Sequence, residues 1–403
     1  MSNPPSNIIK IQGKVKSDNW GGHNYIAELL SIQDRSKPYS EYWLGLYHSY
    51  PSTLLANKNV LLIDYLTKVL EISRNTLEAN FPFLLKVLDV EKMISIQLHP
   101  NSNNAREGFI HEDMWGQKTS TDSDRIYKDL IPKYEALFSI SDFYLLQGFL
   151  ERELMIINLD KYLPIGLKEI FIHGGNKALC EYILELSDDK SVVIIKDIFS
   201  KLEAKESSKD KSDIEYWILK YLSENTNTSV NLDKGFIFMC LLNLIKLNPG
   251  EVIYTKPGIL HSYLYGKCAE VMSNSDNVIR LGLTSKSINH KEILNNLNIE
   301  ATTPTVITPS LEDKFYRKYI FREANFSFTI IGADEATTST MLSIDIEIIL
   351  SLKGCISIKH MDRKIDVHAG EAVVITSGTE YIIEAKDQSF AIIVGAVAPF
   401  IQT

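Results

Sequence analysis

The pattern of apolar residues changes twice along this chain, and this change restricts the possible folds more than any other feature. Between about residues 150 and 245 apolar residues recur at helical spacing, as in ALCEYILEL, SVVIIKDIFSKLE, DIEYWILKYL and GFIFMCLLNLIKL. After Pro249-Gly250 the chain returns to short strand-like runs broken by Gly, Pro, Asn and Asp, which continue to the C-terminus. We therefore expect a mainly β protein with an α-helical insertion.

The length of 403 residues predicts more than one domain. Single hydrophobic cores stop growing at roughly 250 to 300 residues. Apolar residues make up 45% of the chain and charged residues 23%, which is the balance of a globular protein with a sizeable core. We expect two or three domains.

Charge and composition exclude several classes of partner. The formal net charge of -9 argues against a nucleic-acid surface, because phosphate backbones attract clustered Lys and Arg. No run approaches the roughly 20 apolar residues of a membrane span, and the first residues lack the apolar region of a signal peptide. The four cysteines lie far apart. We expect a cytoplasmic protein with no nucleic-acid or membrane partner, in which an anionic substrate would need a local cationic pocket.

The strand-like segment SIQLHP carries the first candidate metal ligands. Gln97 and His99 are two positions apart, so their side chains leave the same face of a strand, together with Ser95. His261, in PGILHSY, supplies a second imidazole after a turn. Glu135, in IPKYEALF, is the candidate carboxylate, because zinc accepts mixed nitrogen and oxygen ligands.

A short pattern occurs twice in the second half of the chain. Gly250-Glu251-Val252 is followed by Gly258 and then His261, and 370–372 is followed at the same offsets by Gly378 and then Tyr381. This spacing resembles the second motif of cupin barrels and suggests two such barrels, which are jelly-roll-like. Since Tyr381 replaces a metal-binding type of residue, only the first barrel is expected to hold a metal.

Three longer segments resemble class I phosphomannose isomerases. They are FPFLLKVLDVEKMISIQLHP, AEVMSNSDNVIRLGLTSK and PYSEYWLGLYHSYPS. The first is similar to the family segment with its Gln-x-His zinc ligands, and the second to the pattern NSDNVxRxGLTxK. The resemblance, which runs from near residue 20 to near residue 290, implies a zinc-dependent isomerase that interconverts mannose 6-phosphate and fructose 6-phosphate.

Carried over residue by residue, the resemblance implies one zinc ion per chain and a catalytic Arg280. The implied zinc ligands are Gln97, His99, Glu135 and His261. Two positions depart from the family pattern. Lys133-Tyr134-Glu135 stands for Lys-Pro-Glu, which leaves Asp129 as the alternative ligand, and His99 is followed by Pro-Asn-Ser where the family has Pro-Asp-Lys, so a lysine is missing.

The implied chemistry moves a proton between C1 and C2 through an enediol, and it assigns roles to further residues. Arg280 offers a permanently charged planar fork that would stabilise the transition state. Glu270 and Lys133 are both candidates for the general base, and the sequence does not choose between them. Ser95 and Lys286 are candidate phosphate anchors that would bind the substrate.

The candidate ligands must meet at one site, and this requirement determines how the domains are arranged along the chain. Because the helical block lies between His99 and His261, it must be inserted into the first barrel. We expect a discontinuous catalytic cupin domain over 1–150 and 245–310, a helical insertion domain over 151–244, and a C-terminal cupin-like domain over 311–403 that lacks a metal site. The protein is expected to be a monomer that acts on a small sugar phosphate.

Two other functions fit parts of this pattern. An iron dioxygenase of the cupin type would use two histidines and one carboxylate with open positions for oxygen. A sugar-phosphate binding protein that lost turnover would explain the missing lysine and the altered Lys-Tyr-Glu. Gln97 as a fourth ligand argues against the first alternative, and the intact NSDNVIR segment argues against the second.

Overall fold

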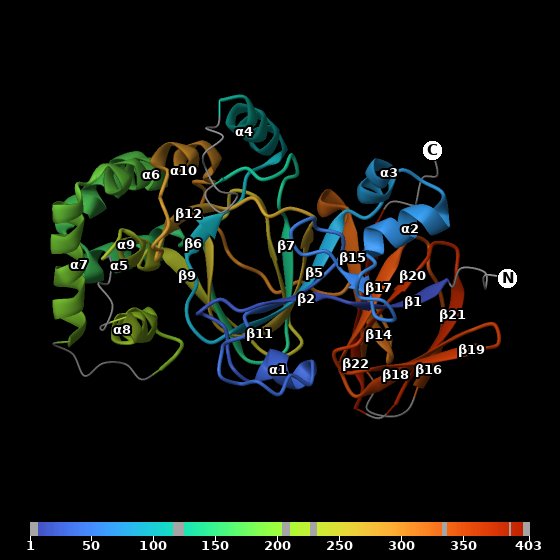
Figure 1. The fold of residues 1–403 in the computed structure, drawn as a ribbon. Helices are drawn as coiled ribbons and strands as arrows, with labels where there is room; N and C mark the ends of the chain where they lie inside the picture. The colour runs from blue at the N-terminus through green and yellow to red at the C-terminus, as the bar shows by residue number, and fades with distance from the viewer. Residues whose placement is uncertain are drawn as a thin grey trace.

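The computed structural model describes residues 7–115, 125–203, 210–225, 232–332, 337–386 and 388–397. A group of helices lies at one end of the molecule, and β sheets form its centre and its other end (Figure 1). Three antiparallel sheets contain the named strands, so the predicted mainly β architecture is confirmed. Among the described helices, none combines the length and apolar character needed to cross a membrane.

The central sheet is built around one long strand, β11 (His261–Ser273). This strand pairs with β5 (Phe83–Val90), β6 (Ile96–Leu98), β7 (Glu135–Ser139) and β8 (Phe143–Phe149). The other strands of the sheet are β2 (Lys14–Lys16), β3 (Glu41–Leu44), β9 (Leu242–Leu247), β10 (Val252–Thr255) and β12 (Ile279–Gly282). Since β11 has four partners, it brings residues more than 100 positions apart into one wall.

Five of the described helices lie outside the helical block. They are α1 (Tyr25–Leu29), α2 (Leu62–Leu70), α3 (Arg74–Ala79), α4 (Ser102–Trp115) and α10 (His290–Asn296). Ser73 ends the turn before α3 and accepts a hydrogen bond from the backbone N–H of Thr76, the usual reason for serine at this position. These five helices were not predicted from the sequence, where helical periodicity was found only between about residues 150 and 245.

The helical block lies where its apolar periodicity predicted. It contains α5 (Arg152–Tyr162), α6 (Ile165–Glu185), α7 (Asp188–Glu203), α8 (Ile214–Asn225) and α9 (Gly235–Met239). One part of the prediction is wrong: the run GFIFMCLLNLIKL is helical only to Met239, and β9 begins at Leu242 and pairs with β8. A continuous apolar run suits a buried strand as well as a buried helix, so its periodicity does not separate the two.

The C-terminal strands lie in an eight-stranded sheet, which also contains two N-terminal strands, and in a four-stranded sheet. The larger one contains β13 (Leu311–Glu312), β14 (Tyr316–Phe321), β15 (Phe326–Gly332), β17 (Glu347–Lys353), β20 (Ala372–Ile375) and β22 (Phe390–Ala396). The smaller one contains β16 (Thr337–Leu342), β18 (Cys355–His360), β19 (Arg363–His368) and β21 (Glu380–Ala385). A 3-10 turn, η1 (Arg322–Ala324), joins β14 to β15.

The first strand of the chain lies among these C-terminal strands. β1 (Ile8–Gln12) pairs with β20, and its other neighbour is β4 (Thr53–Leu54). An ion pair between Lys10 and Glu371, with 2.9 Å between Nζ and Oε2, adds to this attachment. The N-terminal segment therefore crosses from the C-terminal sheet to the central sheet before β2 begins.

Candidate active site

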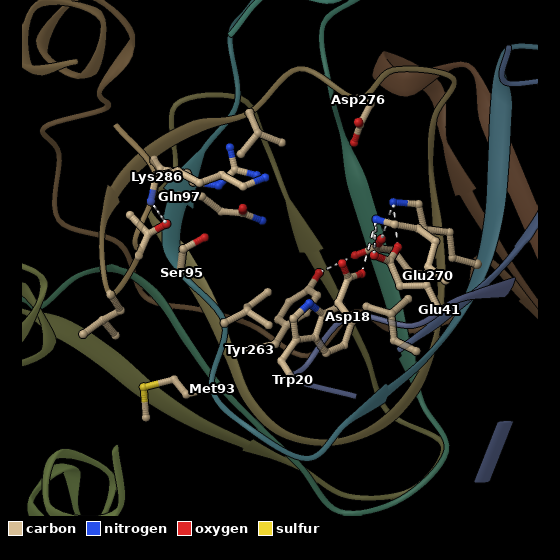
Figure 2. Close-up of a pocket in the computed structure, with 18 of the residues that line it drawn as sticks. Asp18, Trp20, Glu41, Met93, Ser95, Gln97, Tyr263, Glu270, Asp276 and Lys286 are labelled. Carbon is tan, nitrogen blue, oxygen red and sulfur yellow. Dashed lines mark hydrogen bonds and ion pairs between the residues drawn. The ribbon is translucent and has the colours of Figure 1, made fainter. Parts of the chain in front are cut away.

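A pocket of about 760 Å³ opens inside the central sheet. Two walls face each other across it in Figure 2: Ser95, Gln97 and Lys286 lie on one side, and Glu41 and Glu270 lie on the other. Tyr263 and Trp20 lie between them, and Asp276 lies at the far rim of this view. The predicted site residues that line this pocket are Ser95, Gln97, Lys133, Glu135, Glu270, Arg280 and Lys286. His99 and His261 contact Glu135.

A buried cluster of two histidines and one carboxylate lies beside the pocket. His99 Nε2 is 3.1 Å from Glu135 Oε1, and His261 Nε2 is 3.3 Å from Glu135 Oε2. All three residues are at most 2% exposed, and one ligand atom of each lies within 4.8 Å of the others. The structure thus groups Glu135 with the histidines, whereas Asp129 bonds to Asn277 and to the backbone of Asp276.

The contact that Nδ1 of each imidazole makes determines the state of its Nε2. His99 Nδ1 lies 2.8 Å from the carbonyl oxygen of Asn277, and His261 Nδ1 lies 2.9 Å from that of Ile259. A carbonyl only accepts, so each Nδ1 carries the proton, and each Nε2 presents a lone pair towards Glu135. Both Nε2 atoms are buried and make no hydrogen bond. Burial lowers the pKa of His99 to about 4, with Lys133 acting in the same direction, which keeps this ring neutral.

These features fit a metal ion. Two buried lone pairs that face a carboxylate repel it unless a cation lies between them, and neutral imidazoles with a carboxylate are ordinary zinc ligands. Imidazoles that bind metal usually donate their other N–H to a carbonyl or carboxylate, as both do here. The residues present therefore suit a divalent metal, and zinc in particular.

Gln97 and Arg280 lie in line with this cluster. On the sheet, Gln97 is directly opposite His261 on β11 and directly opposite Arg280 on β12. Residues directly opposite each other on neighbouring strands direct their side chains to the same face. Gln97 and Arg280 both line the pocket, so the row from His261 to Arg280 connects the cluster to the cationic wall.

The side chain of Asn277 forms hydrogen bonds that connect this row of residues to the segment before Glu135. Its side-chain oxygen accepts hydrogen bonds from the backbone N–H groups of Lys128 and Asp129, at 2.6 and 3.1 Å. Its amide group donates to the carbonyl oxygens of Asp129 and Ile131. Because the buried Asn277 also contacts His99 through its carbonyl oxygen, it connects His99 to the segment that leads to Glu135.

Lys133 is bound to the cluster rather than free in the pocket. Its amine lies 2.9 Å from Glu135 Oε1, and both side chains are almost fully buried. Burial opposes the charge on the amine, but Glu135, Asp276 and Glu270 keep the pKa of Lys133 above its ordinary value. Burial also opposes the charge of Glu135, yet Lys133 holds the pKa of that carboxyl well below its usual range. Lys133 is thus a cation in this site.

Glu270 is the other candidate base, and its surroundings differ. Tyr263 donates a hydrogen bond of 2.6 Å to Glu270 Oε1, and Lys86 lies 3.9 Å from Oε2. Burial, with help from the charge of Glu135, raises the pKa of Glu270 to about 7. A carboxyl group with such a pKa can accept and release a proton near neutral pH.

Behind Glu270 lies a charged network that the motifs did not reveal. Glu41 contacts Lys16 at 3.0 Å and Lys86 at 3.3 Å, and it accepts a hydrogen bond from the indole N–H of Trp43. Lys86 also lies 4.0 Å from the centre of the Trp43 ring. The PYSEYW segment that resembles the family contains Glu41 and Trp43, but resemblance alone gave them no role. Lys86 lies in the family-like segment FPFLLKVLDVEKMISIQLHP but likewise received no role, and Lys16 lies outside the three segments.

The cations of the pocket fall into two groups. Carboxylates form ion pairs with Lys16, Lys86, Lys128 and Lys133. Within the described part of the chain, no ion pair involves Arg280 or Lys286, although both line the pocket. Burial and the charges of Arg280, Lys128 and Lys16 lower the pKa of Lys286. This wall, which also carries Ser95, therefore has unneutralised positive charge for an anion.

Both departures from the family pattern lie outside the pocket lining. Ser102, at the place of the missing lysine, is exposed at the start of α4. The ring of Tyr134 stacks on Tyr254, away from the buried pair of Lys133 and Glu135. Neither Ser102 nor Tyr134 lines the pocket.

Comparisons with known proteins agree with this geometry. The family model "Phosphomannose isomerase type I, catalytic domain" matches residues 8–152. Mannose-6-phosphate isomerases of Escherichia coli (strain K12) and Shigella flexneri are each 28% identical to the chain over 381 residues, covering 91% of this chain and 94% of each relative. The crystal structure of mannose 6-phosphate isomerase from Salmonella typhimurium, bound to substrate and a zinc atom, superposes with a TM-score of 0.85 at 23% identity, covering 97% of this chain and all of that one. The chain shares the fold of that enzyme.

Proposed function

We propose that this chain is a class I phosphomannose isomerase, which interconverts mannose 6-phosphate and fructose 6-phosphate with one bound zinc ion. The observation that carries this proposal is the buried group of His99, Glu135 and His261, which adjoins a pocket with an unpaired cationic wall. A metal site, a carboxyl base and an anion site within one pocket are the parts that isomerisation of a sugar phosphate needs.

The zinc ligands that we propose are Gln97, His99, Glu135 and His261. Both imidazoles are held by backbone carbonyls with Nε2 directed towards Glu135, and Gln97 lies directly opposite His261. When bound, zinc supplies a Lewis acid that polarises the substrate oxygens. Lys133 neutralises part of the charge of Glu135 and fixes its orientation.

Glu270 is the base in this proposal. Its carboxylate removes the proton from C2 of mannose 6-phosphate and delivers it to C1, while a second proton moves from O2 to O1. Tyr263 and Lys86 hold the carboxylate in place, and the raised pKa suits both halves of the transfer. We prefer Glu270 to Lys133 because the Lys133 amine is bound to Glu135 and stays protonated.

Arg280 and Lys286 divide the negative charge of the substrate between them. Arg280, which lies directly opposite Gln97, stabilises the charge that develops on the enediol oxygens. Lys286 and Ser95 hold the phosphate as substrate-binding residues on the same wall. Neither cation has to break an ion pair with a carboxylate of the described residues before it binds the substrate.

We further propose that the C-terminal sheets form a second barrel related to the first. The N–H of Gly250 donates to Ser139 O and that of Gly370 donates to Ser351 O, both at 2.8 Å, and all four glycines of the repeated pattern have φ between 74° and 93°. β10 pairs with β7 so that Thr255 opposes Glu135, and β20 pairs with β17 so that Ile375 opposes Glu347. The two halves thus repeat the same register.

This repeat identifies the counterpart of each ligand. The matching pairs are Gln97 with Met341, His99 with Ser343, Glu135 with Glu347 and His261 with Tyr381. The Tyr381 hydroxyl donates to Glu347 at 3.0 Å, so a direct hydrogen bond takes the place of a metal. The second barrel keeps only one of the four ligand types, which supports a C-terminal cupin-like domain without a metal site.

The proposed domains follow from this repeat. Residues 1–150 and 245–310 form the catalytic cupin domain, 151–244 the helical domain and 311–403 the second barrel, which β1 joins through its pairing with β20. We also propose that the protein is a cytoplasmic monomer without nucleic-acid or membrane partners. The dioxygenase alternative is disfavoured because Gln97, which is opposite His261 on the sheet, would as a fourth ligand occupy a position that oxygen needs.

The test is an assay of purified protein for conversion of mannose 6-phosphate to fructose 6-phosphate. Activity should disappear after chelation and return with zinc. Arg280→Ala should lower kcat on the order of a hundredfold or more while zinc binding is retained. A zinc-replete protein that binds fructose 6-phosphate without turnover would favour the binding-protein alternative instead.

A further inference from the structure

The turn after β12 forms part of the cationic wall, and a residue of the helical block holds it. Residues 283–286, which include Lys286, all line the pocket. Leu283 has φ of 55°, a left-handed conformation that is unfavourable for a residue with a side chain. The Thr284 hydroxyl accepts a hydrogen bond from the backbone N–H of Lys286, so the turn leads directly to the lysine.

Asp233 supplies the hydrogen bonds that stabilise this turn. Its Oδ1 accepts from the N–H groups of Gly235 and Leu283, at 2.8 and 2.9 Å, and its Oδ2 accepts from the N–H of Thr284 at 3.1 Å. A carboxylate that accepts several backbone N–H groups makes strong, charge-assisted bonds. The side chain thus connects two segments 50 positions apart.

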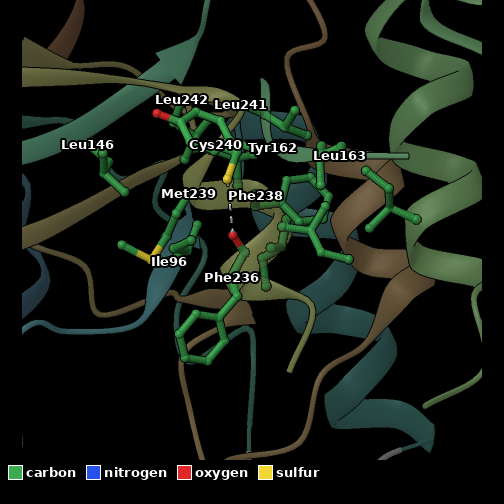
Figure 3. Packing of buried hydrophobic residues seen from close by; sticks show 14 of the residues in the cluster. Ile96, Leu146, Tyr162, Leu163, Phe236, Phe238, Met239, Cys240, Leu241 and Leu242 are labelled. Atoms are coloured by element: carbon green, nitrogen blue, oxygen red, sulfur yellow. Dashed lines mark hydrogen bonds between the residues drawn. The ribbon is translucent and has the colours of Figure 1, made fainter. Parts of the chain in front are cut away.

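The residues around Asp233 make a rigid support. A Cβ on Gly282 would lie 2.4 Å from the Cα of Gly235, so the two backbones are in close contact. α9 follows at once, and Phe236 and Phe238 are fully buried in the core between helices and sheet (Figure 3). Lys234 donates a hydrogen bond of 2.6 Å to the carbonyl oxygen of Leu184 on α6.

We infer that Asp233 is a positioning residue for substrate binding: it holds the 283–284 turn, and through it Lys286, in place for the phosphate group. The inserted helical block thereby takes part in phosphate recognition without placing Asp233 in the pocket. This inference rests on the proposed function, because it assigns the phosphate to Lys286. Lys286 and Asp233 should then act on the same step of binding.

Steady-state kinetics of the zinc-replete full chain would test this. Asp233→Ala should raise KM for mannose 6-phosphate about tenfold, since it removes three charge-assisted hydrogen bonds, with kcat and zinc content within about twofold. Asp233→Asn keeps one acceptor oxygen and should have a smaller effect. Asp197→Asn, on the exposed side of α7, is the matched control and should behave as wild type.

A double-mutant cycle separates positioning from a general loss of structure. In a Lys286→Ala background, Asp233→Ala should change KM by less than about twofold, because residues that act through one another are not additive. An undiminished effect in that background would overturn the inference, as would a loss of kcat or zinc with KM unchanged. Thermal denaturation of Asp233→Asn shows whether this variant keeps the wild-type fold, so that a change in its KM can be distinguished from unfolding.

Binding of inorganic phosphate gives a readout that does not need turnover. The pocket contains Trp20 and Trp43, whose fluorescence should report binding. Weaker phosphate binding by Asp233→Ala than by wild type would support the inference even if the wild type fails to isomerise mannose 6-phosphate. Equal phosphate binding by both proteins would contradict it.

Discussion

The carbonyl oxygen of Asn277 lies 2.8 Å from Nδ1 of His99, although 178 positions separate the two residues. This contact fixes which nitrogen of His99 carries the proton and directs Nε2 towards Glu135. The side chain of Asn277 in turn holds the segment that leads to Lys133 and Glu135. One residue therefore sets the geometry of the proposed metal site from two sides.

Asn277→Ala should weaken zinc binding by roughly 10- to 100-fold, because partners that orient metal ligands contribute about that much to affinity. Competition with a chromogenic chelator would measure the change. Asn103→Ala, on the exposed face of α4, is the control and should bind zinc as the wild type does. Unchanged affinity in Asn277→Ala would show that the carbonyl holds its place without the side chain.

Zinc removal should lower the melting temperature. A ligand at about 100 times its Kd stabilises a protein by about 2.7 kcal/mol, which corresponds to roughly 5 to 10 °C for domains of 150–250 residues. His99→Ala should lose this response to added zinc, and metal analysis should give one zinc per wild-type chain. Two zinc ions per chain would contradict our description of the second barrel.

Glu270→Gln should lower kcat by roughly 10²- to 10⁴-fold, because it removes the proposed base and leaves the metal ligands in place. KM and zinc content should stay within a few-fold of wild type. Glu107→Gln, an exposed substitution on α4, serves as the control. Retention of most of the activity by Glu270→Gln would return the role of base to Lys133 or to another group.

Glu347 predicts a pH effect on stability that is independent of the active site. Burial raises the pKa of Glu347 to about 7, from an ordinary value of 4.5, with Tyr381 and Lys318 opposing the shift and Asp345 adding to it. The folded state therefore keeps a proton that the unfolded state loses above about pH 4.5. This contribution to stability is complete below that pH and is lost as the pH rises through 7.

Glu347→Gln should remove this dependence. The variant should match wild type near pH 4.5 and melt at a higher temperature than wild type at pH 8, with zinc present throughout. Thermal denaturation at several pH values measures the difference between the two proteins. A difference that stays constant from pH 4.5 to pH 8 would show that Glu347 does not titrate in this range.

The amino-acid sequence predicts the structure best where a period or a spacing carries the information. A strand alternates its side chains with a period of two, so Gln97 and Ser95 had to share a face, and both line the pocket. The helical periodicity located the block that contains α5–α9. It failed for 242–247, where the apolar run is continuous and only pairing with β8 makes it a strand.

The amino-acid sequence alone determined the helical block, the glycines of the repeated turns and the resemblance to class I phosphomannose isomerases, because these depend on neighbouring residues and on spacing. Tertiary structure alone decided which distant groups meet. It grouped Glu135 rather than Asp129 with the histidines, joined β1 to β20 and placed Asp233 against the turn at Leu283. Pairing across a sheet joins residues separated by hundreds of positions, and no local pattern encodes the register that results.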